Sequence, residues 1–321
     1  MDILFNNFIK EQILSFRTTK FSLNDLKSKY KNNHKLLLIE IKNQKVFCHR
    51  TAIDFFDRKK RIINMIENTL KKYKIKDTLL LFNIFDSYYW EGDFPVFNFI
   101  LPHGKKGFIF PTYDFLRNRY LKDFNYDEIK NEFVKYSVNK NNIKNNIYFK
   151  GANTTEKNTN IRQKLSDEAT PFKIIVNKDQ SEPMYKLKDY KYLIDLPGSK
   201  PWSVRFKYLA LAEKAVIRIS FFNSKYDETG YWRQYTDLFY KENIDYVHLV
   251  YDINYEKLIS NNIYSKIKND ILKVYNKFEQ NKNFYNTFVK NINKSSINVN
   301  NDNTYNYIAL LINSYTDSLL V

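Results

Sequence analysis

Short β-rich runs alternate with helical stretches through the second half of the chain, and this alternation constrains the fold more than any other feature of the sequence. The runs lie at residues 147–149, 172–176, 190–196, 215–220 and 246–250. Strands that alternate with helices are typical of units in which neighbouring strands run parallel. A long amphipathic helix follows them, because Ile267, Ile271 and Phe278 recur at helical spacing. The second half is therefore predicted to be an α/β unit with a parallel sheet.

The first part of the chain mixes helix and strand patterns. Residues 36–41 are predicted to form a strand, and Ile63, Ile66 and Leu70 share one face of a predicted helix. Residues 78–85 form an almost continuous apolar run, which indicates a strand covered on both faces, as in a parallel sheet. A length of 321 residues favours two domains. This part is predicted to be a second α/β domain.

A polar region rich in lysine and asparagine, residues 122–146, separates the two parts. We place the domain boundary there, with residues 1–145 forming one domain and residues 146–290 the other. Residues 291–303 are predicted to be a polar, asparagine-rich connection. It leads to a final apolar helix within residues 304–321, which is a candidate to pack back on the first domain.

The chain is basic, with 52 lysines and arginines against 35 acidic residues and a formal charge of +17. A basic surface attracts phosphate, so nucleic acid is one class of partner to consider. The 26 tyrosines and 26 phenylalanines would supply rings for base stacking. However, the lysines are spread along the chain among asparagines, and no recognisable nucleic-acid-binding module is present. The preferred interpretation is a solvated surface or a basic cleft for a smaller anion, with nucleic-acid binding as an alternative.

Two features bear on the compartment of the protein. Cys48 is the one cysteine, so no disulfide forms within the chain, and a reducing compartment is expected. Residues 1–16 contain polar breaks and lack the apolar centre of a signal peptide. No apolar run approaches the roughly 20 residues of a membrane-spanning helix. We expect a cytoplasmic protein without a transmembrane segment, and contact with a membrane surface stays open.

The most informative segment, residues 190–209, reads Tyr-Lys-Tyr-Leu-Ile-Asp-Leu-Pro-Gly-Ser-Lys-Pro-Trp-Ser-Val-Arg-Phe-Lys-Tyr-Leu. A strand runs into a tight turn at Pro197 and Gly198, and a helix is predicted to begin near Ser203 with Arg205 in its first turn. Backbone N–H groups at a helix start bind anions, and an arginine there adds a bidentate phosphate partner. The alternative is an ordinary helix cap with a surface arginine.

Two further segments carry candidate functional residues. Residues 148–155 form a short strand that opens into Gly151 and hydroxyl residues including Thr154, where a backbone would approach phosphate or ribose oxygens. The alternative there is a turn or a helix cap. Residues 81–90 place Asp86 at the end of a buried strand, followed by aromatic residues. That arrangement suits a sugar-binding cleft with a carboxylate base, and the alternative is an aspartate that caps a turn.

Taken in order, these segments resemble glycosyltransferase family 90, which includes protein O-glucosyltransferases and capsule-associated xylosyltransferases. Five segments of this chain, residues 83–86, 95–99, 149–154, 191–207 and 247–248, are similar to patterns of the family. In the same order, the family patterns are Asn-x-x-Asp, Pro-Val-Phe-x-Phe, Phe-Arg-Gly-Ser-x-Thr, a lysine-tyrosine strand with a Ser-x-Arg-Phe-Lys helix start, and a Val-His strand. The resemblance covers residues 79–258.

The resemblance implies a GT-B type enzyme, with two Rossmann-like domains facing a cleft. Such an enzyme moves a sugar from a nucleotide sugar, here a UDP-sugar, to a hydroxyl of a glycan or protein acceptor, with inversion and without a metal or other cofactor. By position, Asp86 would be the general base. The residues that would line the nucleotide-sugar site are Gly151, Thr154, Arg162, Gly198, Ser203 and Arg205.

Metal ligands are not evident in the sequence. The four histidines are far apart, and no Cys/His set has zinc spacing. No Asp-x-Asp motif of the kind that holds a metal in the other major glycosyltransferase fold is present, and the nearest pattern, residues 91–93, is predicted to be a loop. We therefore predict no metal site.

The chain departs from the family pattern at several positions. Lys150 and Ala152 replace the usual Arg and Ser, Asn153 stands where an Arg is frequent, and Gln234 and Tyr235 replace a Glu-Trp pair. These changes leave the donor sugar open, with UDP-glucose and UDP-xylose as candidates. They also leave open the alternative that the chain is a member of the fold that binds glycans but has lost catalytic activity.

Overall fold

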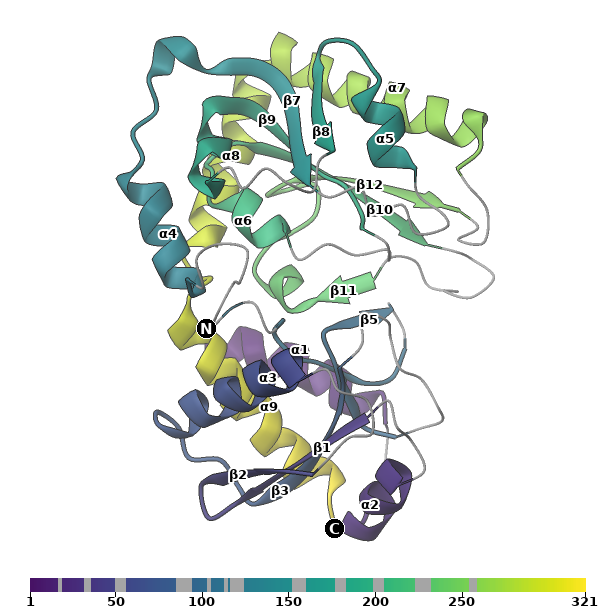
Figure 1. Ribbon diagram of the computed structural model, residues 1–321, viewed down its shortest axis with the longest axis vertical. Coiled ribbons are helices and arrows are strands. Elements are labelled where there is room, and N and C mark those ends of the chain that lie inside the picture. Colours follow the sequence, from purple (N-terminus) through teal and green to yellow (C-terminus); the bar gives the residue numbers. More distant parts are fainter. Residues whose placement is uncertain are drawn as a thin grey trace.

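The fold is described from a computed structural model of the chain (Figure 1). The structure describes residues 1–16, 19–31, 36–49, 56–84, 94–102, 105–112, 115, 124–151, 160–176, 183–198, 205–222, 232–253 and 259–321. Within these residues the protein is a mixed α/β structure with two five-stranded sheets and a small two-stranded sheet. The predicted α/β class is confirmed.

The first sheet has the strand order β2-β1-β3-β4-β6. Its strands are β1 (Leu36–Lys42), β2 (Lys45–Cys48), β3 (Thr78–Asn83), β4 (Val96–Asn98) and β6 (Phe108–Ile109). β3 is buried along its whole length, as its apolar run predicted. It runs parallel to β4 but antiparallel to β1, so the expectation of parallel neighbours holds on one side only. The first sheet is therefore mixed.

Among the described residues, four helices accompany the first sheet. They are α1 (Asp2–Leu14), α2 (Leu23–Lys31), α3 (Phe56–Leu70) and α9 (Asn301–Leu319). The C-terminal helix α9 packs against α1 and α3 (Figure 1). The hydroxyl of Tyr315 donates to the carbonyl oxygen of Leu79 at 2.9 Å, and that of Tyr307 donates to Ile109 at 2.7 Å. Both hydroxyls are buried, so these bonds join the end of the chain to β3 and β6.

The second sheet has the strand order β12-β10-β9-β7-β8, and every pairing in it is parallel. Its strands are β7 (Lys144–Gly151), β8 (Phe172–Val176), β9 (Tyr190–Asp195), β10 (Ala215–Phe222) and β12 (Val247–Asp252). The predicted parallel sheet is confirmed. β8 lies on one side of β7 and β9 on the other, so the order of strand addition reverses at β7. Ligands of open parallel sheets bind at such a reversal, beyond the carboxyl ends of the strands.

Helices cover both faces of the second sheet. They are α4 (Tyr126–Lys135), α5 (Ile161–Ser166), α6 (Phe206–Ala210), α7 (Asn261–Gln280) and α8 (Lys282–Ser296), with short 3₁₀ turns η2 (Lys140–Asn142) and η3 (Met184–Asp189). Ile194 and Ile217 pack with the buried face of α7, as the spacing of Ile267 predicted. The opposite face, which includes Leu193, belongs to the core that also contains the first sheet.

A two-stranded sheet lies between the two larger ones (Figure 1). It pairs β5 (Ile100–Pro102) with β11 (Trp232–Gln234) in antiparallel register. The next element, the 3₁₀ turn η4 (Tyr235–Leu238), places the buried ring of Tyr235 against Phe115 and Tyr307. The positions that depart from the family's Glu-Trp pair, Gln234 and Tyr235, therefore form a buried joint between the sheets.

The predicted connection at residues 291–303 is wrong. α8 continues to Ser296 and α9 begins at Asn301, which leaves four residues, 297–300, between them. Phe288 and Ile292 are buried at helical spacing and hold α8 in place. The asparagines of this region occupy helix positions, and Asn300 caps α9 by accepting a hydrogen bond from the amide of Asn303 at 2.8 Å. A polar composition was thus mistaken for the absence of a helix.

None of the helices in the described part of the chain is long and apolar enough to cross a bilayer.

Candidate functional site

Two arginines share one aromatic ring near the carboxyl end of β7. Phe149 is buried in this strand, and its ring centroid lies 4.9 Å from the Cζ atom of Arg162 and 4.6 Å from that of Arg205. Arg162 is the second residue of α5, whereas Arg205 directly precedes α6. Guanidinium groups at this distance from a ring are attracted by its π electrons. Phe149 therefore contacts two cations, one from α5 and one from the residue before α6.

Gly151, the last residue of β7, lies against the guanidinium of Arg205. A Cβ atom built on Gly151 would stand 2.7 Å from Nη2 and 3.0 Å from Cζ of Arg205. Side-chain atoms do not approach a Cβ so closely, so this position of Arg205 depends on glycine at 151. The close approach brings the cation to the end of the strand, where the order of the sheet reverses.

One carboxylate, that of Asp195, faces these two arginines and a third arginine, Arg218. Asp195 ends β9, is 2% exposed, and interacts electrostatically with both Arg162 and Arg205. Its Oδ2 atom lies 3.8 Å from Nε of Arg218, which also contacts Asp237 through Nη1 at 2.5 Å. Three arginines and two aspartates thus form a charged network along the ends and one face of the second sheet, and positive charge exceeds negative charge by one.

The environment disfavours the charge on the paired arginines. Burial lowers the pKa of Arg162 to about 9, the nearby charge of Arg205 lowers it as well, and Asp195 opposes both effects. Burial also lowers the pKa of Arg205, again against Asp195. For Arg218, burial is the largest single effect and acts in the same direction, but Asp237, Tyr246 and Asp195 together outweigh it and the pKa is raised. Arg218 is therefore compensated by carboxylates, whereas an added anion would stabilise Arg162 and Arg205.

Three of the residues singled out in the sequence meet here: Gly151, Arg162 and Arg205. Gly198 lies on the segment that leaves β9, where Nη2 of Arg162 donates to the carbonyl oxygen of Leu196 at 3.0 Å. The other predicted site residues, Asp86, Thr154 and Ser203, lie outside the described residues.

The helix predicted to begin near Ser203 differs in the described structure. α6 begins at Phe206 and has five residues, with Arg205 as the residue before it rather than in its first turn. A helix this short has few aligned peptide dipoles, so it supplies little of the positive field that was expected at its start. The guanidinium groups therefore supply the positive charge of this site.

Three residues of the network, Asp195, Arg218 and Asp237, were missed in the sequence, and the first two carried a signal. Asp195 ends an apolar strand just before a turn, which is the same signal that drew attention to Asp86. Arg218 interrupts the apolar run of β10, and a charge inside a buried strand indicates a partner or a function. Both signals were available, but their shared location depended on β9 and β10 being neighbours.

In the first sheet, two buried asparagines join the ends of parallel strands. Asn83 closes β3 and donates from Nδ2 to Oδ1 of Asn98, at the end of β4, over 2.9 Å. Asn98 donates in turn to the carbonyl oxygen of Val96 at 3.0 Å. Asn83 begins the Asn-x-x-Asp pattern of residues 83–86, so this amide pair fixes the point from which that pattern starts.

The described residues contain no group of three or more histidine, cysteine, aspartate or glutamate side chains placed to hold a metal ion. Comparison of the sequence with protein-family models and with curated proteins gives no match.

Proposed function

We propose that this protein is an inverting glycosyltransferase of GT-B type that moves a sugar from a UDP-sugar to a hydroxyl group of a glycan or protein. The observation that carries the proposal is the pair formed by Arg162 and Arg205 on the ring of Phe149. Arg205 of this pair lies beside Gly151, at the reversal point of a parallel sheet, which is a usual location for nucleotide phosphates.

A diphosphate suits this pair for electrostatic reasons. Arginine forms two parallel hydrogen bonds with phosphate oxygens, and two guanidiniums in contact with one ring suit the two linked phosphoryl groups of a diphosphate. Burial and mutual repulsion lower the pKa of Arg162, so a bound dianion would relieve a cost that the protein bears without it. In this proposal the second sheet binds the donor, and the acceptor lies on the side of the first sheet. In Figure 1 the arrow of β7 points toward the part of the molecule that holds the first sheet.

The proposed reaction is a direct displacement. The acceptor hydroxyl oxygen attacks the anomeric carbon while Asp86, assigned through the family resemblance, takes its proton. The bond from the anomeric carbon to the diphosphate oxygen breaks, and its electron pair leaves with UDP. Arg162 and Arg205 would stabilise the negative charge that develops on the leaving group, which is where fixed donors lower a barrier most. A carboxylate with an ordinary pKa near 4 is already deprotonated at neutral pH and serves as base without further activation.

The departure at Gln234 and Tyr235 lies at the joint between the sheets. Both side chains are buried, and Tyr235 packs in the joint and lies close to Thr304 of α9, with 3.3 Å between the two hydroxyl oxygens. The ring of Tyr235 thus has a structural role between the sheets.

Calorimetry with uridine, UMP and UDP tests the donor site. UDP should bind more tightly than UMP, and uridine weakest, because the arginine pair contacts phosphate. Arg205→Ala and Arg162→Ala should each weaken UDP binding by about 1.5–3 kcal/mol. Lys173→Ala, which removes an exposed cation from neighbouring β8, is the matched control. Melting temperatures show whether each variant is folded, and Arg205→Lys serves if the alanine variant is not. Equal affinity for uridine and UDP would refute the site.

Transfer itself is tested with the protein and a panel of UDP-sugars. Release of UDP above the rate of spontaneous hydrolysis, with inverted stereochemistry at the product's anomeric carbon, is the expected result. Retained stereochemistry would exclude direct displacement.

A further inference from the structure

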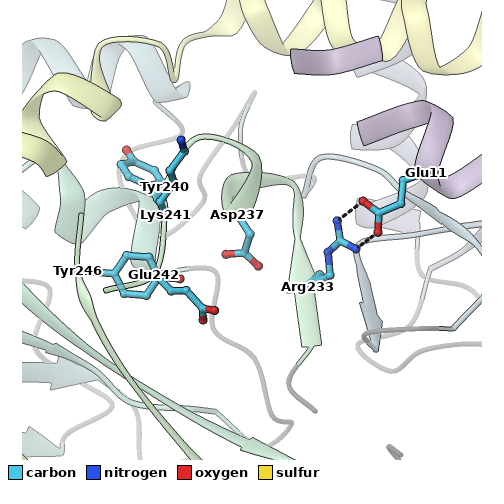
Figure 2. A pocket seen from close by; sticks show the side chains of 7 residues that line it. All are labelled: Glu11, Arg233, Asp237, Tyr240, Lys241, Glu242 and Tyr246. Atoms are coloured by element: carbon cyan, nitrogen blue, oxygen red, sulfur yellow. Dashed lines mark hydrogen bonds and ion pairs between the residues drawn. The ribbon is translucent and has the colours of Figure 1, made fainter. Parts of the chain in front are cut away.

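A pocket of about 400 Å³ opens beside the joint between the two sheets (Figure 2). Glu11 of α1 and Arg233 of β11 line one side of it, and the segment that leads from η4 into β12, residues 237–246, lines the other. Ligand pockets of small molecules have volumes of this order. Each of the lining side chains carries a hydrogen-bonding group. The pocket is thus polar, and it is built from segments far apart in the chain.

The carboxylates of the pocket are already oriented by cations or imidazole. Glu11 receives two bonds from Arg233, at 2.5 and 3.2 Å (Figure 2), and Asp237 contacts Arg218 at 2.5 Å. Glu242 lies 2.7 Å from Nδ1 of the buried His248. A ligand would therefore meet carboxylates whose positions are set before it binds, which lowers the entropic cost of binding.

His248 leaves the charge of Glu242 intact. Its Nε2 atom lies 2.8 Å from the hydroxyl of Ser220, and burial lowers its pKa to about 4. At neutral pH the imidazole is uncharged, so its Nδ1 carries the hydrogen that is donated to Glu242, and Nε2 accepts from Ser220. The side chain of Glu242 is 46% exposed. It presents a charged hydrogen-bond acceptor to the pocket.

Two tyrosines complete the lining. Tyr240 and Tyr246 are each 2% exposed, and both rings pack edge-on against Phe206, with centroids 5.2 and 4.6 Å away. Their positions are therefore fixed by the core. Because so little of either ring is exposed, the two tyrosines form a rigid wall behind the charged side chains, and those side chains are the groups that a ligand contacts.

The charge of the lining discriminates between ligand classes. Glu11, Asp237 and Glu242 contribute three negative charges, and Arg233 and Lys241 contribute two positive ones. The buried Arg218 offsets Asp237, so the lining and this ion-pair partner carry no net charge, although the whole chain carries +17. The pocket therefore gives phosphate, uronate and other anions no net attraction. A neutral ligand with many hydroxyl groups matches the oriented carboxylates.

We infer that this pocket binds a neutral saccharide and is the acceptor site of the protein. Saccharide binding follows from the pocket itself, whereas the acceptor role rests on the function proposed above. The position of Arg218 supports that role. Its Nη1 atom contacts Asp237 of the pocket, and its Nε atom lies 3.8 Å from Asp195, which interacts with the paired arginines. The acceptor pocket and the donor site thus share one buried arginine.

The test uses a glycan array that carries neutral oligosaccharides and matched glycans with uronic or sialic acid, followed by titration of the best neutral ligand into the protein. We expect binding to neutral members only. Glu242→Gln should weaken it about tenfold or more, since a charge-assisted acceptor is lost. Glu132→Gln, a matched change on the exposed surface of α4, should not affect it. UDP affinity, measured on the same preparations, should be unchanged in both variants.

The outcomes separate this inference from the proposed function. If no neutral glycan binds, if acidic glycans bind better, or if Glu242→Gln binds like the wild type, the pocket is not a neutral saccharide site, even where UDP binds. If neutral glycans bind in the expected way but UDP does not, the saccharide pocket stands and the glycosyltransferase proposal fails.

Discussion

The guanidinium of Arg205 lies where the side chain of residue 151 would be, since a Cβ atom on Gly151 would stand 2.7 Å from its Nη2. The glycine is thus a requirement for the position of an arginine that is distant in the sequence. Arg205 in turn shares the ring of Phe149 with Arg162.

Gly151→Ala is expected to weaken UDP binding about tenfold while leaving the fold intact. The added methyl group displaces the guanidinium of Arg205, but the backbone of Gly151 lies outside the left-handed region, so alanine fits it. Calorimetry and thermal melting on one preparation measure both effects. Gly107→Ala is the contrasting variant, because φ is +147° there: it should lower the melting temperature instead. Unchanged UDP affinity in Gly151→Ala would show that Arg205 is not part of the phosphate site.

Arg218→Met is expected to destabilise the protein by about 3–5 kcal/mol, because it leaves the buried carboxylates of Asp195 and Asp237 without their shared cation. Arg233→Met is the matched control. Its partner Glu11 has a side chain that is 60% exposed, so the loss of that ion pair should cost about 1 kcal/mol or less. Urea unfolding at pH 7 compares the two variants. Similar losses would show that the network does not depend on Arg218.

His248 makes stability depend on pH. Because burial lowers its pKa to about 4 from the ordinary 6.5, the unfolded chain binds a proton more readily than the folded one. This contribution to stability is complete above about pH 6.5 and declines as the pH falls toward 4. Its loss amounts to about 2–3 kcal/mol. The free energy of unfolding, measured by urea titration between pH 4 and 7, should fall less steeply in His248→Asn than in the wild type. Parallel profiles would contradict the prediction.

Asp86→Asn is expected to reduce sugar transfer by about 10²–10⁴, since the amide does not accept the acceptor's proton. UDP affinity and melting temperature should stay at wild-type values, because the proposed phosphate contacts are Arg162 and Arg205. The three measurements are made on one preparation with the donor found in the UDP-sugar panel. Transfer within threefold of the wild type would remove Asp86 as the base. A parallel loss of UDP affinity would make it a donor contact instead.

Much of the secondary structure followed from local patterns in the sequence. The strands β8, β9 and β10 lie where their apolar runs predicted, and α7 buries the residues expected from helical spacing. The alternation of strands and helices also predicted parallel pairing in the second sheet. These features are local because burial on a strand or helix repeats every two residues or every three to four. The prediction of a connection at residues 291–303 was wrong because it was based on polar composition. The helical pattern there is formed by a few apolar residues, which the many polar ones concealed.

The sites depended on contacts that no local pattern specifies. The sequence singled out Gly151, Arg162 and Arg205 through motifs, but their meeting on Phe149 depends on the packing of α5 and α6 at the end of β7. Asp195 and Arg218 became one network because β9 and β10 are neighbours, and the polar pocket exists because α1 lies beside the segment that enters β12. Sequence periodicity reports which side of an element is buried, whereas the element that covers it is selected by packing across the whole core.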